Sequence, residues 1–342
     1  MEHSPVKITL QTTLCSLVLV LSLLGCADKN RLDIPVPDEG ALIKIERLDV
    51  AWFDMTPISF RREHPRWQSE YGELYTRYVE DVLNLGAVGD SNLFAEIRGF
   101  TTNESILEVK HEVDRLYPDL QDLELELSTA WNYYRFYFPA GNIPKHISFN
   151  GGFNTPVAMT GDGIGIGLEM FLGAQCPFYD YLQIPVYLRS RMTPEHITPT
   201  VIMGWIETEY PLTDPAPTLL ETIVHQGKVL YCLDAILPRS PDGRKIFYTD
   251  VQVQWAQTHE PYVWAHFIDN EMLFTTDRAE IGKFTNKGPF TVDLVKESPS
   301  RMGFYIGWQI VRAYMAKQDT IDLPALMATD AEAILNQSKY KP

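Results

Sequence analysis

The apolar run from Leu14 to Leu24 limits what this chain can fold into more than any other feature of the sequence. It is 11 residues long, whereas a helix needs about 20 apolar residues to cross the hydrocarbon core of a membrane. Lys7 supplies a weak positive charge ahead of it, which is the arrangement of a secretory signal peptide. No other apolar run approaches the length of a spanning segment. We therefore expect residues 1–25 to be a signal peptide and the rest to form a globular body outside the cytoplasm.

The residues at the end of this run predict a lipid anchor. They read Leu23-Leu24-Gly25-Cys26, which resembles the bacterial lipobox, in which the cysteine is diacylated, the signal is removed and the new amino terminus is acylated. An ordinary secretory signal with an incidental Cys26 is the alternative. Two or more acyl chains hold a protein on a membrane, whereas a single chain binds only marginally. We assign residues 26–40 to the acylated cysteine and a polar tether, and residues 41–342 to the globular domain.

The residues after the anchor bear on which membrane holds it. Ala27 follows Cys26 and Asp28 comes next, so the usual retention signal, an aspartate directly after the lipidated cysteine, is missing. We expect a protein of the cell envelope whose body lies in the periplasm, with the outer membrane favoured over the inner membrane.

Charge and composition exclude one broad class of function. The sequence has 45 acidic residues against 29 Lys and Arg, a formal net charge of −16. Nucleic-acid binding needs a concentration of positive charge to neutralise phosphates, and the chain has no Lys/Arg-rich stretch. With 45% hydrophobic residues it has enough apolar material for a large core. An acidic surface suits basic protein partners and repels anionic lipid headgroups.

Helical periodicity dominates the first part of the body. Three stretches carry apolar residues at three- and four-residue steps, and they end at Gly86, Pro118 and Pro139. Such stripes are typical of helices that face a core. Their members are Trp67, Tyr71, Leu74, Tyr78 and Val82; Ile106, Val109, Val113 and Leu116; and Leu120, Leu123, Leu127, Trp131, Tyr134 and Phe138.

From Gly141 the pattern changes to short β-like runs separated by glycine-containing turns. These runs cover residues 146–150, 156–159 and 164–168, and residues 41–50 read as an earlier strand. Helices are expected to resume near Glu195, Thr218, Glu260, Ser298 and Leu323. We therefore expect a single α+β domain, mostly helical, with a small central antiparallel sheet.

Two cysteines remain in the mature body, Cys176 and Cys232, because Cys15 leaves with the signal and Cys26 carries lipid. They could pair in an oxidising compartment. We favour two buried free thiols that pack as small apolar residues.

The segment from Thr218 to Leu233 comes closest to a catalytic motif. Thr218 and Glu221 form a capping-box pattern, so a helix should begin there. A zinc-peptidase helix needs two histidines four residues apart and a glutamate base after the first. His225 occupies the first position, but Gln226 stands where the base would be and Val229 where the second ligand would be. The motif is degenerate, and we expect no catalytic residue, no metal and no cofactor.

A rebuilt metal site is the alternative. Glu221 and His225 are four residues apart, and Glu260 is expected near the start of a helix over residues 257–274. These three side chains could form a shifted ligand set. Helix capping already explains Glu221, and Glu260 followed by Pro261 is a normal helix start.

The segment from Ser298 to Met315 is expected to pack closely against the His225 helix. Ser298 followed by a proline is the pattern of a cap and a first helical residue. Gly303 and Gly307 are four residues apart and leave one helix face bare for a close neighbour. Arg301 and Arg312 could pair with core carboxylates or bind an anionic ligand.

Taken together, these segments resemble the gliding-motility lipoprotein family GldB of Bacteroidetes-type bacteria. The resemblance implies a lipid-anchored protein of the gliding or associated envelope machinery, and it carries over one functional position, Cys26. A weaker similarity of the His225 helix and the helix after it to zincin-type peptidases implies a zincin-like fold. The segments that carry the family resemblance are the lipobox, Ser148 to Asn154, Ile164 to Gly173, Ile184 to Met192, Val224 to Pro238, Trp255 to Ile268, Glu297 to Met315 and the terminal SKYKP.

The leading hypothesis is a non-enzymatic, lipid-anchored protein, a pseudoenzyme that binds envelope or gliding-machinery proteins. The alternatives are a zinc-dependent peptidase with the shifted ligand set, and a module that binds a peptide or glycan in the degenerate cleft. The residues expected around that cleft are Glu221, His225, Gln226, Tyr231, Glu260, Arg301, Trp308 and Arg312.

Overall fold

The structure, a computed structural model, describes residues 31–342. The chain divides into two compact units, residues 1–35 and Val36–Pro342, and every helix and strand below belongs to the second. The signal peptide and the lipidated Cys26 lie outside the described residues, so both stay predictions, as do the domain limits. Among residues 31–342, no helix combines the length and the apolar character that crossing a membrane requires.

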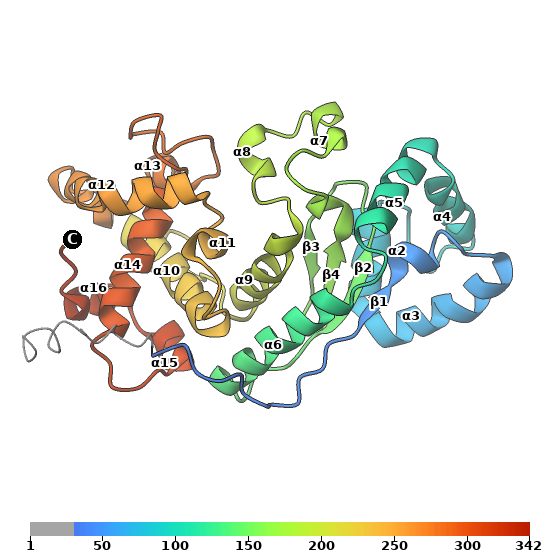
Figure 1. The fold of residues 1–342 in the computed structure, drawn as a ribbon, viewed down its shortest axis with the longest axis horizontal. Coiled ribbons are helices and arrows are strands. Elements are labelled where there is room, and N and C mark those ends of the chain that lie inside the picture. Colours follow the sequence, from blue (N-terminus) through green and yellow to red (C-terminus); the bar gives the residue numbers. More distant parts are fainter. Residues whose placement is uncertain (1–30) are drawn as a thin grey trace, which may run out of the picture. The chain divides into compact units, whose positions relative to one another are not determined.

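The described residues form an α+β fold in which helices predominate, as expected from the sequence (Figure 1). The strands are β1 (Ile45–Arg47), β2 (Lys145–Phe149), β3 (Val157–Met159) and β4 (Gly163–Gly167). The α-helices are α2 (Leu48–Ala51), α3 (Pro57–Arg77), α4 (Leu93–Thr101), α5 (Glu104–Leu116), α6 (Gln121–Tyr137), α7 (Pro177–Tyr181), α8 (Val186–Arg189), α9 (Ile197–Glu209), α10 (Leu219–Ile236), α11 (Asp242–Ile246), α12 (Asp250–Asp269), α13 (Arg278–Thr285), α14 (Met302–Met315), α15 (Leu323–Ala328) and α16 (Ala331–Ser338). A π-helix, η1 (Tyr78–Val82), continues α3, and short 3₁₀ helices are η2 (Leu168–Phe171), η3 (Pro194–His196) and η4 (Met272–Phe274).

The sheet lies where the sequence predicted it, but the expectation of an antiparallel sheet is wrong. The strand order is β1-β2-β4-β3. β1 pairs with β2 and β2 with β4 in parallel, and only β3 and β4 are antiparallel. β4 lies between β2 and β3 in the sheet, and it runs parallel to β2. Every residue of β4 is buried, as is usual for parallel strands covered on both faces.

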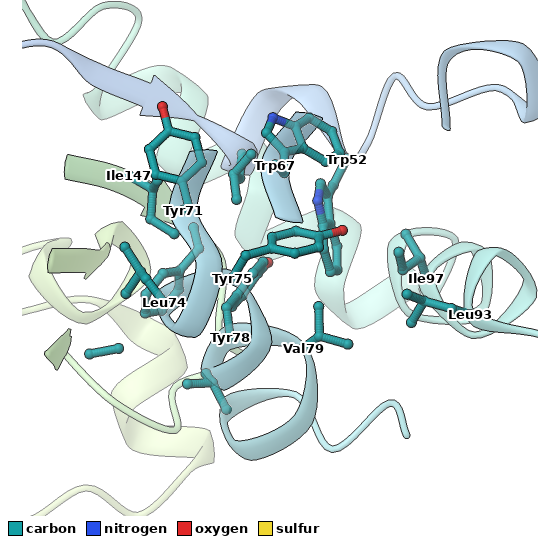
Figure 2. Close-up of a cluster of buried hydrophobic side chains, with 14 of the residues drawn as sticks. Trp52, Trp67, Tyr71, Leu74, Tyr75, Tyr78, Val79, Leu93, Ile97 and Ile147 are labelled. Carbon is teal, nitrogen blue, oxygen red and sulfur yellow. The ribbon is translucent and has the colours of Figure 1, made fainter. Parts of the chain in front are cut away.

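The first predicted helix is present, with a break at Gly72 (φ 42°), and it supplies the core beside the sheet. Trp67, Tyr71 and Leu74 are buried on α3, and Figure 2 shows their side chains grouped with Trp52. Tyr78, in the π-helical turn that follows, stacks on Phe149 of β2 with ring centroids 4.8 Å apart. Offset aromatic pairs at this spacing add to the energy of simple burial.

The second and third predicted helices are also confirmed. α5 ends at Leu116, just before Pro118, and α6 ends at Tyr137, before Pro139. A proline lacks an amide hydrogen and restricts the residue before it, so both prolines act as stop signals.

The close packing predicted between two glycine-bearing helices is found between α10 and α14, which lie side by side (Figure 1). A Cβ atom on Gly307 would lie 1.8 Å from the carbonyl oxygen of Ile223, and one on Gly227 would lie 2.3 Å from the carbonyl oxygen of Gly307. Real Cβ atoms do not come this close to a backbone. The two backbones therefore touch at a point where only glycine fits.

Two predicted helix starts are wrong. α14 begins at Met302 after Arg301, which has a left-handed backbone (φ 63°). Ser298 does not cap it and instead accepts a hydrogen bond from the Thr291 amide at 3.2 Å. α12 begins at Asp250 with a capping box from Thr249 and Gln252, so the sequence Glu260-Pro261 lies inside the helix. The proline after an acid suggested a start there, but the capping box upstream determines it.

Both cysteines of the body are free and buried. Cys176 precedes α7 and Cys232 lies on α10. The favoured interpretation of two packed thiols is confirmed.

Candidate functional site

The residues that the sequence grouped around a degenerate cleft fall into separate places in the fold. Glu221 caps α10: its Oε2 accepts hydrogen bonds from the amide and the hydroxyl of Thr218, each at 2.7 Å. His225 is half-buried, and burial together with the charge of Lys228 lowers its pKa. The Gln226 Nε2 atom donates to Glu207 Oε1 at 3.1 Å. The capping role of Glu221 is confirmed.

Arg312 and Trp308 belong to a buried charge cluster centred on Asp234, which we call the Asp234 cluster. Arg312 donates to both carboxylate oxygens of Asp234 at 2.8 Å and to Asp242 at 2.7 and 2.8 Å. Lys245 Nζ and Trp308 Nε1 complete the shell of Asp234 at 2.8 and 2.9 Å. Arg312 thus pairs with core carboxylates, which is one of the two roles predicted for it from the sequence.

Glu260 and Tyr231 have structural surroundings of their own. The Glu260 carboxylate accepts hydrogen bonds from the Tyr305 hydroxyl at 3.1 Å and the Tyr340 hydroxyl at 2.8 Å. Tyr231 is buried on α10. Within residues 31–342, no three His, Cys, Asp or Glu side chains lie close enough together to hold a metal ion. Glu221, His225 and Glu260 are therefore not brought together as a ligand set.

The structure has a large pocket, and only two of the residues predicted around the cleft, Gln226 and Arg301, line it. Its volume is about 1140 Å³, which exceeds the range of about 300–1,000 Å³ usual for small-molecule sites. Its walls come from the segment spanning α7 and α8, from α9, from the residues after α13 and from the start of α14. In Figure 1, α8 and α13 both project on the same side of α9.

The lining mixes apolar and polar side chains. The apolar part includes Phe153, Met170, Phe171, Leu182, Ile184, Leu188, Met192, Met203, Phe247 and Phe304. The polar part includes Gln183, Thr200, Glu207, Gln226, Thr285 and Asn286. Such a surface can bury apolar groups and still satisfy hydrogen bonds along its length.

Three basic side chains, Arg191, Lys287 and Arg301, line the same pocket, and we call them the pocket cations. None of them forms an ion pair with any residue in the described part of the chain. Burial and the charge of Arg301 lower the pKa of Arg191 to about 10. Partial desolvation in the pocket and the charges of Arg191 and Arg301 likewise lower the pKa of Lys287. The charge of Glu207 offsets part of this lowering for Lys287 and Arg301.

Arg301 is the most confined of the three. Its Nη2 atom donates to the carbonyl oxygen of Ile246 at 3.3 Å, and its guanidinium carbon lies 5.8 Å from the ring centre of Phe304. The Nε atom is buried and has no hydrogen-bond partner among the described residues. A buried donor without a partner is costly. Burial also lowers the pKa of Arg301.

Glu207 is the acidic residue of the lining, and it does not neutralise the pocket cations. It accepts its hydrogen bond from Gln226. Burial raises its pKa, although the charges of Arg301 and Lys287 act in the opposite direction. With three basic groups and one acidic group, the lining has a surplus of positive charge in a chain whose net charge is −16.

A smaller pocket adjoins the first at the pocket cations. It shares Arg191, Lys287, Arg301 and Phe247 with the large pocket, and it adds Tyr187, Tyr248, Gln252, Gly288 and Ser300. Its volume is about 20 Å³. The pocket cations therefore line two adjoining cavities.

A strained loop shapes one wall of the large pocket. Gly152 and Phe153 both have left-handed backbones, with φ of 62° and 65°, and Phe153 lines the pocket. The fully buried Glu169 holds this loop, because its Oε1 accepts hydrogen bonds from the amides of Gly151 at 2.7 Å and Phe153 at 3.2 Å. Burial raises the pKa of Glu169 to about 7.

Sequence reasoning missed Arg191, Lys287 and Glu207. Arg191 lies in a segment that was singled out for the family resemblance, but no periodic pattern marks it. Lys287 lies in the loop after α13. No signal in the sequence connects these residues, because they come from separate parts of the chain.

The fold and the pocket define the class: an α+β protein with a large, partly apolar pocket in which positive charge gathers. The chain belongs to a family of gliding motility proteins, because the family model described as gliding motility protein GldB matches residues 29–342. No match was found among curated proteins or among solved structures.

Family membership confirms the resemblance drawn from the sequence, and the zincin-type resemblance gains no support. The family connects this chain with gliding motility, and its lipoprotein name indicates a lipid-anchored protein of the cell envelope.

Proposed function

We propose that this chain is a non-enzymatic component of the gliding machinery that acts through protein–protein interaction, and that the large pocket receives a segment of a partner. In this proposal the body lies in the periplasm, anchored through Cys26 to the outer membrane. The pocket is the observation that carries the proposal. It is larger than most small-molecule sites, and its mixed lining suits a chain with both apolar and polar groups.

The arrangement at the degenerate motif supports a binding role over a catalytic one. Gln226 stands where a zinc peptidase has its base, and its amide is engaged with Glu207. Glu221 and Glu260 bond to hydroxyl groups of the protein. Glu221 and Glu260, the two carboxylates of the shifted ligand set, thus each have a structural partner.

Filling the pocket tests the proposed function. Leu188 lines it from α8 and is half-buried, so Leu188→Trp should fold while occupying part of the space. Cells that carry this variant as their only copy should keep normal amounts of anchored protein and lose gliding. The matched control is Leu107→Trp, at a leucine that is 45% exposed on α5 and outside the lining. Normal gliding by the Leu188→Trp cells would overturn the proposal.

Elemental mass spectrometry of the full-length lipoprotein, purified in detergent without added zinc, tests the non-enzymatic part. We expect no stoichiometric zinc that depends on His225. Near-stoichiometric zinc that disappears in His225→Ala would contradict this part and favour the peptidase.

A further inference from the structure

The pocket cations differ from the basic groups that pair with carboxylates elsewhere in the fold. Arg66 donates to Glu63 and Glu70 at 2.7 and 2.9 Å, and Lys283 bonds Glu280 and Asp293 at 2.9 and 3.1 Å. Acidic residues outnumber basic ones in this chain, so partners are abundant. Three basic groups that share a cavity without pairing to a described carboxylate are therefore an arrangement that needs a cause.

The surroundings of Arg301 indicate that the pocket suits an anion. A guanidinium group presents donors in a planar fork that matches a carboxylate or a phosphate. Here one donor bonds a carbonyl oxygen, and the buried Nε has no partner in the described chain. Arg191 and Lys287 border the same two cavities. An anion placed among these three groups would relieve the repulsion among them and would bond the Arg301 guanidinium, which lines the pocket.

We propose that Arg191, Lys287 and Arg301 form a carboxylate-binding subsite, and that the pocket takes an acidic, partly apolar peptide segment of a partner protein. This inference rests on the proposed function and specifies the chemistry of the partner. An Asp or Glu side chain or a free C-terminus bonds the pocket cations, and neighbouring apolar side chains lie against Leu188, Met203 and the other apolar walls.

Charge complementarity and the distribution of polar groups favour a peptide over a lipid. An anionic lipid would also satisfy the three cations, but its acyl chain would cover Gln183 and Asn286, whose side chains form no hydrogen bond within the described residues, and burying unpaired polar groups is costly. A peptide has an N–H and a C=O at almost every residue and can pair with such groups along the pocket. The lining therefore fits a peptide better than a lipid.

Selection from a phage-displayed library of random peptides tests the inference. The full-length lipoprotein, held in a neutral detergent, serves as bait. We expect enrichment of peptides with an Asp, a Glu or a free C-terminal carboxylate beside apolar residues. Lys287 is exposed, so Lys287→Glu should fold, which its thermal unfolding checks. It should bind the selected peptides at least about 10-fold more weakly, since charge-assisted hydrogen bonds contribute on that scale.

The matched control is Lys296→Glu, which makes the same charge change at an exposed lysine outside both pockets. It should keep the preference for acidic peptides and their affinity. Loss of both in the control would mean that net charge, and not the pocket, selects the peptide, and would overturn the inference.

The remaining outcomes separate the two proposals. Peptides that bind without acidic preference, and equally well to Lys287→Glu, overturn the carboxylate subsite and leave the proposed function standing. If no peptide binds better to the unchanged chain than to Leu188→Trp, both proposals fail. Mass spectrometry of an organic extract tests the lipid: a near-stoichiometric anionic lipid that is lost in Lys287→Glu overturns the peptide assignment.

Discussion

The two ends of α14 hold positive charge in opposite ways. Near its C-terminal end, Arg312 lies in the Asp234 cluster, where two carboxylates and an indole complete the hydrogen bonds. At its N-terminal end, Arg301 lies among the pocket cations with a donor that no described residue satisfies. Both ends pack near α10, which supplies Asp234 to one region and Gln226 to the other. The same helix pair thus supports a completed charge network and an incomplete one.

This contrast separates the region that stabilises the fold from the region that binds a partner. A satisfied buried network fixes the packing of the elements that contribute to it. Unpaired like charges lower stability, and they persist where activity requires them. We therefore assign the Asp234 cluster to architecture and the pocket cations to binding. This assignment predicts opposite effects of neutralising an arginine or lysine in the two regions.

The largest effect is expected from Gly307→Ala, which disrupts the contact beneath both regions. The added Cβ would lie 1.8 Å from the Ile223 carbonyl oxygen, so the helices would have to separate. We expect a loss of more than about 4 kcal/mol of unfolding free energy, or no folded protein. Urea unfolding followed by circular dichroism measures it.

Gly99→Ala is the control for this variant. Gly99 lies on α4, and a Cβ there meets nothing within 4 Å. It should stabilise the fold by about 0.5–1 kcal/mol through helix propensity. Equal effects of the two glycine substitutions would contradict a tight contact between α10 and α14.

A loss of about 3 kcal/mol is expected from Arg312→Met, because it removes the guanidinium that bonds both Asp234 and Asp242. Breaking a buried ion pair by removing one member leaves an uncompensated charge. Arg312 is 28% exposed and Lys245 still bonds Asp234, so we place the loss at the lower end of the usual range. Chemical denaturation at neutral pH measures this loss. A change below about 1 kcal/mol would contradict a stabilising role for the Asp234 cluster.

Glu169 is an intermediate case, since Oε1 is hydrogen-bonded and Oε2 has no partner within residues 31–342. Its pKa is raised by burial from 4.5 to about 7. Between these pH values the unfolded chain has released the proton while the folded chain holds it, so this group's contribution to stability falls as pH rises through that window. The fall is on the order of 3 kcal/mol.

Glu169→Gln removes this titration and keeps an oxygen acceptor for Gly151 and Phe153. The stability of the variant relative to the unchanged chain should therefore increase from pH 4.5 to pH 7 and stay constant at higher pH. Unfolding curves across this range test the sign, and a difference that does not vary with pH would show that Glu169 is ionised throughout.

The smallest effect on stability is expected in the pocket. Lys287→Gln removes one of three like charges and breaks no described ion pair, so unfolding free energy should stay the same or rise by less than about 1 kcal/mol. Differential scanning calorimetry beside Arg312→Met makes the comparison direct. A loss as large as that of Arg312→Met would mean that Lys287 has a structural role.

The elements of this fold that could be predicted are those with local signals. The capping box of Thr218 and Glu221, the stops at Pro118 and Pro139, and the paired glycines of the last long helix are each encoded within a few residues. Strand direction could not be predicted because it depends on β4 entering between β2 and β3.

The candidate site was harder to predict for the same reason. Gln226 was identified as part of a degenerate zinc motif, and Arg301 as a residue that could pair with core carboxylates or bind an anionic ligand. The pocket forms where Arg191, Lys287 and Arg301 meet from distant parts of the chain, and no spacing rule connects them. Trp308 and Arg312 lie on the same helix as the pocket residue Phe304, yet they contribute to the Asp234 cluster.

The most direct test of this account is the gliding of cells whose only copy carries Arg191→Gln and Lys287→Gln together. The account predicts normal amounts of anchored protein, an unfolding temperature no lower than that of the unchanged chain, and no gliding. Cells that glide normally with this double variant would contradict the claim that the pocket cations are kept for binding a partner.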